Sequence, residues 1–135
     1  MLAKSEPDTS RTLLHYEVGG KEGEPWVVFV HGEGGSVRTW KLQVGDFAPH
    51  FRLLFLDLRD HGYSKNMQPA YDSYDFQIIA NDILKVIDHL EIKKAHFLSL
   101  SVGSVVLQQI DMESVDYLLA LTRIDEVNLV ASQIS

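Results

Sequence analysis

Apolar and polar positions divide the chain into stretches with two different periods. Residues 26–30 and 51–56 are almost continuously apolar and rich in β-branched or aromatic side chains, which is typical of strands buried on both faces. Residues 95–100 repeat this pattern, and residues 13–18 form a further strand candidate. The apolar pattern therefore predicts a sheet with at least three buried strands.

Three other stretches predict helices. The strongest is Phe76–Leu90, where apolar residues recur every three or four positions and Ser73 or Asp72 is placed to cap the start. Residues 36–47 predict an earlier helix with its first residue as the cap, and residues 102–109 predict a later one. Strands that alternate with helices indicate an α/β fold, in which a mostly parallel sheet carries helices on both faces.

The two ends of the chain are less regular. Residues 1–11 are polar and predict a loose N-terminal arm, which leaves residues 12–135 as the folded part. Towards the other end, residues 117–122 are favoured as a fourth parallel strand, and residues 127–131 compete for that role. A third interpretation makes the whole stretch from Ser104 one long, broken helix.

Composition narrows the class of protein. The chain has 135 residues, of which 45% are hydrophobic and 23% charged, as expected for one soluble domain. Its formal net charge is −7 and it has no basic stripe, so we expect no binding to nucleic acid or to an anionic membrane. It contains no cysteine, which excludes disulfides and thiol chemistry. No secretory signal or membrane span is visible, so a cytoplasmic location is expected.

The first candidate for chemistry lies where residues 95–100 give way to a helix. Here the sequence approximates the pattern G-x-S-x-G, in which a tight turn lifts the central Ser above the edge of the sheet. Ser101 is the central residue, Gly103 holds the later Gly position, and the small Ser99 replaces the earlier Gly. The alternative is that Ser101 only caps the following helix.

A second candidate, His31–Gly35, closes the first buried strand. Its three glycines allow the backbone to bend so that N–H groups point into a cleft, as stabilisation of an oxyanion requires. The alternative is an ordinary glycine-rich turn. Neither the G-x-G-x-x-G spacing nor a Walker Lys is present, so the stretch does not predict a phosphate site, and no cofactor is expected.

A third candidate, Asp57–Ser64, leaves the second buried strand with acidic, basic and imidazole groups crowded together. Such a cluster suits a metal or an acid–base role. The favoured interpretation is a turn held by contacts between Asp57 and Arg59 and by hydrogen bonds from polar side chains to the backbone. The remaining histidines lack the spacing of metal ligands, so no metal site is expected.

In this order and at these intervals, the three motifs resemble the α/β-hydrolase fold superfamily. The resemblance covers roughly residues 12–122 and is nearest to the single-domain esterase, perhydrolase and carbon–carbon hydrolase branch. It implies a serine nucleophile at position 101, which distinguishes the chain from haloalkane dehalogenases and epoxide hydrolases, since those use Asp there.

The resemblance also implies roles for the residues around Ser101. The backbone N–H groups of Glu33 and Val102 match the two donors of the oxyanion hole. His31 and Gly32 match the pair that shapes this loop, with His31 structural and not the catalytic base. The turn at residues 57–64 matches one that supports the site.

The resemblance ends where the catalytic acid and base belong. Members of the superfamily are considerably longer and place their acid and their His after later strands, in the order Ser, acid, His. No histidine follows His96, so the general base has no counterpart here, although Asp125 or Glu126 could mimic the acid. We therefore expect the chain to correspond to the N-terminal part of such a domain.

Two functions from different classes follow. The first is a hydrolase that uses Ser101 on a small ester or related acyl substrate. The alternative is a non-catalytic α/β-hydrolase-like domain or fragment that binds a ligand or a partner chain through its open sheet edge. Such an edge also favours self-association.

Overall fold

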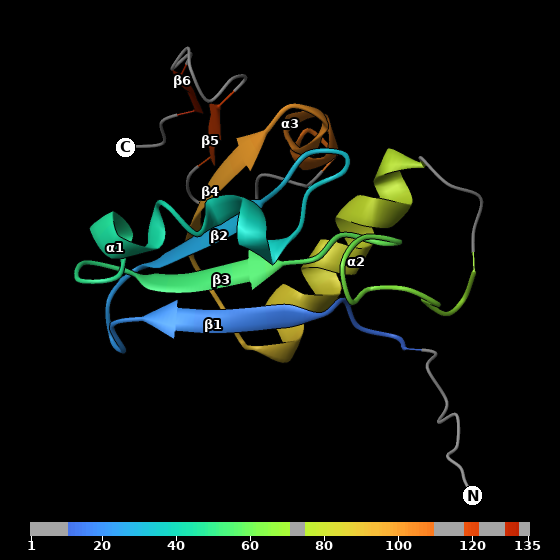
Figure 1. The fold of residues 1–135 in the computed structure, drawn as a ribbon, viewed down its shortest axis with the longest axis horizontal. Helices are drawn as coiled ribbons and strands as arrows, with labels where there is room; N and C mark the ends of the chain where they lie inside the picture. The colour runs from blue at the N-terminus through green and yellow to red at the C-terminus, as the bar shows by residue number, and fades with distance from the viewer. Residues whose placement is uncertain (1–10, 71–74, 110–117, 122–128, 133–135) are drawn as a thin grey trace, which may run out of the picture.

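The computed structural model describes residues 11–70, 75–109, 118–121 and 129–132. Its elements follow one another as β1 (Tyr16–Gly20), β2 (Trp26–Val30), the 3-10 helix η1 (Val37–Trp40), α1 (Val44–Phe47), β3 (Arg52–Leu56), α2 (Phe76–His89), β4 (Ala95–Leu100), α3 (Val102–Leu107), β5 (Leu118–Leu121) and β6 (Leu129–Ser132). Figure 1 shows η1 and α1 on one side of the sheet and α2 on the other. The α/β class with helices on both faces is confirmed.

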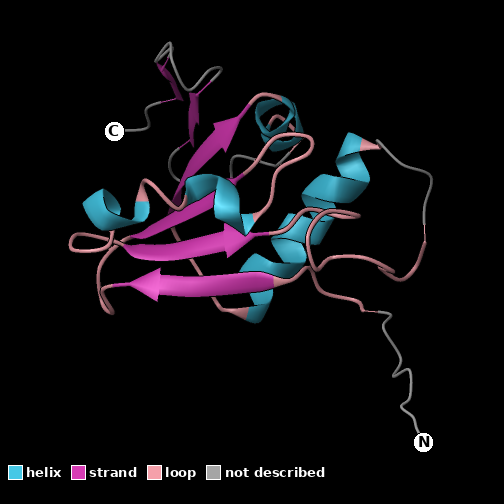
Figure 2. Cartoon of the chain, viewed as in Figure 1, coloured by secondary structure: helices cyan, strands magenta, loops and turns pink. Residues whose placement is uncertain are grey.

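The described strands form one sheet in the order β1-β3-β2-β4-β5-β6 (Figure 2). β3, β2, β4 and β5 run parallel, whereas β1 and β6 pair antiparallel to their neighbours at the two edges. The parallel core places the carboxyl ends of β2, β3 and β4 at one edge of the sheet, where loops from different strands meet. All three sequence motifs begin at these ends.

Alternation along the buried strands explains why they are continuously apolar. On β2, Val28 and Val30 pack on the side of α2 and α3, whereas Val27 and Phe29 pack on the side of η1 and α1. Phe29 is fully buried, and its ring lies 5.1 Å from that of Trp40 and 4.7 Å from that of Phe55. Each face of the sheet therefore has its own hydrophobic core.

Several predicted boundaries are corrected. The helix predicted over residues 36–47 is split into η1 and α1, because β-branched Val37 and Thr39 and the interior Gly45 are weak helix formers. Its predicted cap is confirmed, since the Ser36 hydroxyl accepts the N–H of Arg38. α2 is capped by Asp75, whose carboxylate accepts two backbone N–H groups. The predicted caps Ser73 and Asp72 lie outside the described residues.

The strands at the edges also differ from expectation. β1 begins and ends later than the predicted residues 13–18, because its pairing with β3 extends to Gly20 opposite Arg52. Residues 118–121 form the predicted fourth parallel strand, and residues 129–132 add an antiparallel one beside it. The long broken helix is wrong, since α3 ends at Leu107. Self-association along the outermost strand β6 stays a prediction.

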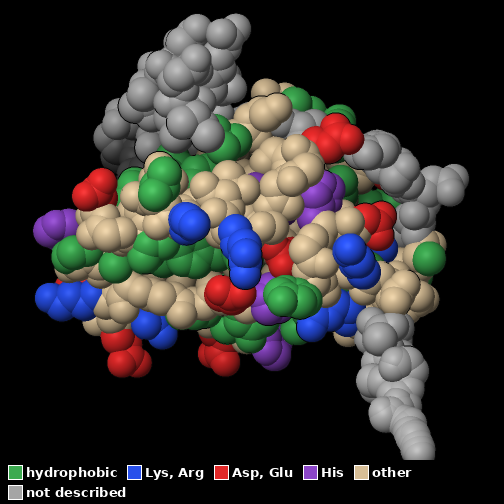
Figure 3. Space-filling view, in the orientation of Figure 1, with side chains coloured by type: hydrophobic (Ala, Val, Ile, Leu, Met, Phe, Trp, Pro, Cys, Tyr) green, Lys and Arg blue, Asp and Glu red, His purple; other side chains and the backbone are tan. Residues whose placement is uncertain are grey.

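Two surface properties complete the description. On the face seen in Figure 3, basic and acidic side chains are interspersed around exposed hydrophobic ones, without a field of one sign. Over the described part of the chain, no helix combines the length and apolarity that crossing a membrane requires.

Arg11, the last residue of the predicted arm, is tied to the loop after β3, because its backbone exchanges hydrogen bonds with Asn66 and Gln68.

A buried ion pair joins α2 to the loop after β3. The guanidinium of Arg59 donates two hydrogen bonds, of 2.7 and 2.8 Å, to the carboxylate of Asp82, and a third of 2.9 Å to the carbonyl of Pro69. Both side chains are at most 5% exposed. Because a buried charge without its partner is costly, this pair fixes the loop relative to the helix.

We expect Asp82→Asn to lower the free energy of unfolding by about 3–5 kcal/mol, because it leaves the Arg59 charge buried without a counter-charge. The matched control is Asp88→Asn on the exposed face of the same helix, which we expect to change it by less than about 0.5 kcal/mol. Urea unfolding followed by circular dichroism measures both. Equal stabilities of the two variants would contradict this role of the pair.

Candidate active site

Ser101 occupies the turn between the end of β4 and the start of α3. Its φ is +51°, a left-handed conformation that non-glycine residues seldom adopt, and its side chain is exposed. Strain of this kind persists only where the surrounding structure enforces it, and it is common at active sites. The strained turn matches the elbow predicted from the sequence. An ordinary capping serine would instead have extended backbone angles.

Two glycines bring the end of β2 against this turn. A Cβ placed on Gly103 would lie 2.7 Å from the carbonyl oxygen of His31 and 2.8 Å from that of Val30. A Cβ placed on Gly32 would lie 3.1 Å from the Cβ of Ser101. The approach at position 103 requires glycine, and the one at position 32 leaves little room for a side chain. The segment His31–Gly35, here called the glycine loop, therefore lies in contact with the Ser101 turn.

His31 anchors the base of the glycine loop. Its side chain is fully buried; Nδ1 lies 2.6 Å from the carbonyl oxygen of Gly32, and Nε2 accepts the N–H of Leu58 at 3.0 Å. Since a carbonyl only accepts, Nδ1 carries the proton and Nε2 is the acceptor. Burial lowers the pKa of His31, and the nearby His61 lowers it further against the opposing effects of the Gly32 carbonyl and Asp57. The ring is therefore held neutral.

The segment 57–64, here called the Asp57 loop, holds the glycine loop and the start of η1. The buried carboxylate of Asp57 accepts the N–H of Val37 at 2.8 Å and that of Tyr63 at 2.9 Å. The hydroxyl of Ser64 donates to the Asp57 carbonyl at 2.6 Å. The predicted side-chain-to-backbone hydrogen bonds are thus present, whereas the guanidinium of Arg59, predicted to contact Asp57, binds Asp82 and the carbonyl of Pro69. No group of three or more metal-ligating side chains occurs among the residues that the structure describes.

The structure brings most of the predicted site residues together and adds two further ones, Asp82 and His61. Glu33 and Gly32 lie on the glycine loop, and Val102 and Gly103 follow Ser101 directly at the start of α3. Asp125 and Glu126 lie outside the described residues. Sequence reasoning missed Asp82 and gave His61 no role of its own. A lone carboxylate on the apolar face of α2, between Ile79 and Ile83, was the available signal for Asp82.

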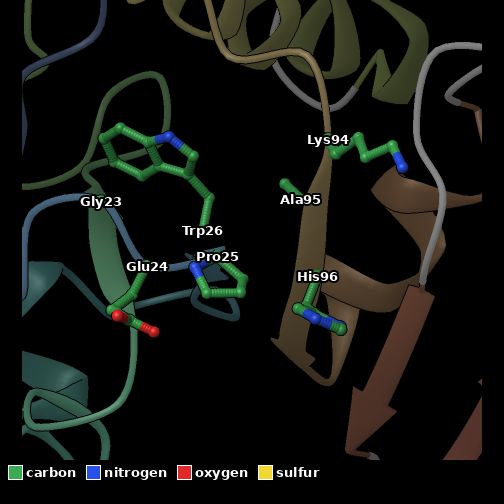
Figure 4. A pocket seen from close by; sticks show the side chains of 7 residues that line it. All are labelled: Gly23, Glu24, Pro25, Trp26, Lys94, Ala95 and His96. Carbon is green, nitrogen blue, oxygen red and sulfur yellow. The ribbon is translucent and has the colours of Figure 1, made fainter.

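A pocket of about 410 Å³ lies at the other end of the sheet (Figure 4). Its lining comes from the segment that enters β2, including Trp26, and from the start of β4, including Lys94 and His96. These are the amino ends of the parallel strands, and in open α/β sheets ligands bind outside the carboxyl ends. The candidate active site therefore lies at the opposite edge, around Ser101.

A mixed sheet with a strained serine turn at the carboxyl end of a parallel strand, beside a glycine loop, defines an α/β hydrolase scaffold. Comparison with known proteins agrees: the model of the α/β hydrolase fold family matches residues 25–110, and the chain belongs to this family. The resemblance seen in the sequence is therefore confirmed.

Individual relatives and a solved structure also match this chain. The chain is 36% identical to the dihydrolipoyllysine-residue acetyltransferase component of the acetoin cleaving system of Pseudomonas putida, over 71% of this chain and 25% of the relative. It is 30% identical to 3-oxoadipate enol-lactonase 1 of Acinetobacter baylyi, over 68% and 33%. The crystal structure of the enol-lactonase from Burkholderia xenovorans LB400 superposes with a TM-score of 0.70 at 29% identity, over 78% and 41%. The chain thus spans between a quarter and about two fifths of these proteins.

The close approach at Gly103 should reverse the stabilising effect that a Gly→Ala substitution usually has inside a helix. We expect Gly103→Ala to lower the free energy of unfolding by about 1–3 kcal/mol, because the methyl group meets two backbone carbonyls that cannot move aside. The control, Gly45→Ala in α1, has open space around it and should raise the stability by up to about 1 kcal/mol, as helix propensity alone predicts. Chemical denaturation compares them. A stabilising Gly103→Ala would contradict the contact.

His31 predicts a pH dependence of stability. Its folded-state pKa lies below the usual 6.5, so the unfolded chain binds a proton more readily. The associated stability is complete above pH 6.5 and is lost as the pH falls from there through the folded-state pKa. Urea unfolding between pH 7.5 and 5.5 should show this loss. Burial also lowers the pKa of His96, so His96→Asn is the control: His31 is not the cause if the loss vanishes in that variant.

Proposed function

We propose that Ser101 is the nucleophile of a serine hydrolase that acts on a small ester, lactone or related acyl substrate. The observation that carries the proposal is the φ of +51° at Ser101, at the carboxyl end of β4, with the glycine loop packed against its Cβ. This geometry presents an exposed hydroxyl beside backbone segments rich in N–H donors. The names of the relatives, which include enol-lactonases and a putative esterase/lipase, support the acyl class.

The chemistry follows from the arrangement. The Oγ of Ser101 attacks the acyl carbon while a general base takes its proton, and the carbonyl oxygen becomes an oxyanion. The backbone N–H groups of Glu33 and Val102 donate to that oxyanion. The protonated base returns its proton to the leaving oxygen as the tetrahedral intermediate collapses, which expels the alcohol and leaves an acyl-serine. Water then hydrolyses this ester, releasing the carboxylic acid and regenerating Ser101. Donors that are already in place stabilise the transition state by about 3–4 kcal/mol each.

In this proposal the reacting group of the chain is Ser101 and not a histidine, because the two histidines at this edge are already engaged. In His31 and in His61, both ring nitrogens, Nδ1 and Nε2, form hydrogen bonds to the backbone. Without its base, a serine site retains about 10³–10⁴-fold catalysis over water from the oxyanion hole and binding. A test of the site should therefore not depend on proton removal from the hydroxyl. A cytoplasmic location stays a prediction from the sequence.

A cysteine scan meets this requirement, because the chain contains no other thiol. A thiolate forms without a neighbouring base and attacks p-nitrophenyl acetate, which releases p-nitrophenolate and leaves an acetyl thioester. We expect Ser101→Cys to acylate roughly 10²-fold faster per thiolate than Gln108→Cys, an exposed thiol just after α3, because only the former has oxyanion donors. Release of p-nitrophenolate at 400 nm, as a function of pH, gives both rates and both thiol pKa values.

The outcome separates the two classes of function. A faster Ser101→Cys, with the added acetyl mass on that residue alone, supports an acyl-transfer site. Equal rates per thiolate on folded variants would contradict the oxyanion hole, and the alternative of a non-catalytic binding domain would then be preferred.

A further inference from the structure

His61 reaches from the Asp57 loop to the tip of the glycine loop. Its Nε2 accepts the backbone N–H of Gly34 at 3.0 Å, a contact between residues 27 positions apart. Its ring also lies against that of His31, with the ring centres 5.0 Å apart. The ring therefore stands between the anchored base of the glycine loop and its exposed tip.

The tautomer of this ring is set by a second hydrogen bond. Nδ1 of His61 lies 2.9 Å from the carbonyl oxygen of Arg59, and a carbonyl only accepts. In the neutral ring, Nδ1 thus carries the proton, which leaves the Nε2 lone pair directed at Gly34. Arg59 is itself fixed by its buried pair with Asp82. The position of the acceptor is consequently tied to α2.

The tip of the glycine loop needs such support. Glu33 and Gly34 are exposed, and Gly34 has a φ of +83°, where glycine has wide conformational freedom. Within the loop, a turn bond joins the N–H of Gly35 to the carbonyl of Gly32, and His31 binds that same carbonyl. These bonds fix the two ends of the loop, whereas the His61 bond fixes the residue directly after Glu33.

We propose that His61 is a positioning residue that holds the glycine loop through Gly34 and so orients the N–H of Glu33. The claim about the loop stands on the hydrogen bonds alone. The consequence for catalysis rests on the proposed function, in which that N–H contacts the developing oxyanion. Orientation matters because a donor that is already aligned needs no reorganisation when charge develops.

Two substitutions of His61 separate its hydrogen bond from its packing. The amide oxygen of His61→Gln reaches the position of Nε2 and can still accept the N–H of Gly34. His61→Asn is one methylene shorter, so it reaches only the position of Nδ1 and loses Gly34. Both variants remove the ring from His31 equally. Circular dichroism and thermal unfolding establish that each is folded.

The first readout is independent of chemistry. NMR measures exchange of the Gly34 amide with water, with Lys21 as the reference amide, since its N–H bonds to Phe51 at the opposite end of the sheet. We expect His61→Asn to accelerate exchange at Gly34 by between about threefold and tenfold, as the loss of one ordinary hydrogen bond implies, and His61→Gln to restore it. Equal exchange in the two variants would overturn the proposal.

The second readout links the loop to the site. In the Ser101→Cys background, His61→Asn should slow acylation per thiolate by a similar factor, and His61→Gln should restore the rate. Slowing by both variants would mean that only the ring packing matters, which overturns the positioning role. If the parent Ser101→Cys is no faster than Gln108→Cys, the proposed function fails, and exchange at Gly34 still decides whether His61 holds the loop.

Discussion

The contact between the end of β2 and the turn after β4 determines the arrangement of this edge of the sheet. The two strands are hydrogen-bonded neighbours, so their carboxyl ends meet, but a side chain at position 103 would keep them apart. With glycine there, the carbonyls of Val30 and His31 approach the first turn of α3. The glycine loop then begins in contact with Ser101, so main-chain packing places the start of the loop.

The polar network forms a second level of support on this contact. The Asp57 loop contacts residues 31–37 at three points. The N–H of Leu58 binds the ring of His31, the ring of His61 binds the N–H of Gly34, and the carboxylate of Asp57 binds the N–H of Val37. Each bond joins a side chain to a backbone group, so each fixes a loop that has no regular structure of its own. The Arg59–Asp82 pair then connects the loop to α2. A chain of contacts thus runs from a helix on one face to the exposed tip of the glycine loop.

Local pattern predicted the elements of the core well. Continuous apolar runs predicted β2 and β4 at their observed bounds, because a strand buried on both faces is apolar at every position. The 3.6-residue period predicted α2, because a helix buried on one face is apolar at every third or fourth position. The turn at Ser101 was also predictable, since small residues at fixed spacing are needed there. The family resemblance came from the order of the motifs and not from any one of them.

What the sequence did not reveal depends on partners distant along the chain. The pairing of β1 with β3, and its extension to Gly20, is decided by backbone hydrogen bonds that side-chain pattern does not record. Asp82 finds its partner 23 residues away, and His61 finds Gly34 at a distance of 27. Neither spacing corresponds to a local motif, so the partner of each side chain becomes known only when the loops are placed in space.

The hydrogen bonds of the two site histidines limit the chemistry that they can perform. A general base needs a lone pair that faces the proton it removes. In His31 and in His61 the proton lies on Nδ1 and points to a carbonyl, and the Nε2 lone pair is occupied by a backbone N–H. Serving as a base would require either ring to break the bond that holds the loops together. These rings are therefore suited to support, and the proposed nucleophilic role of Ser101 requires a base other than these two.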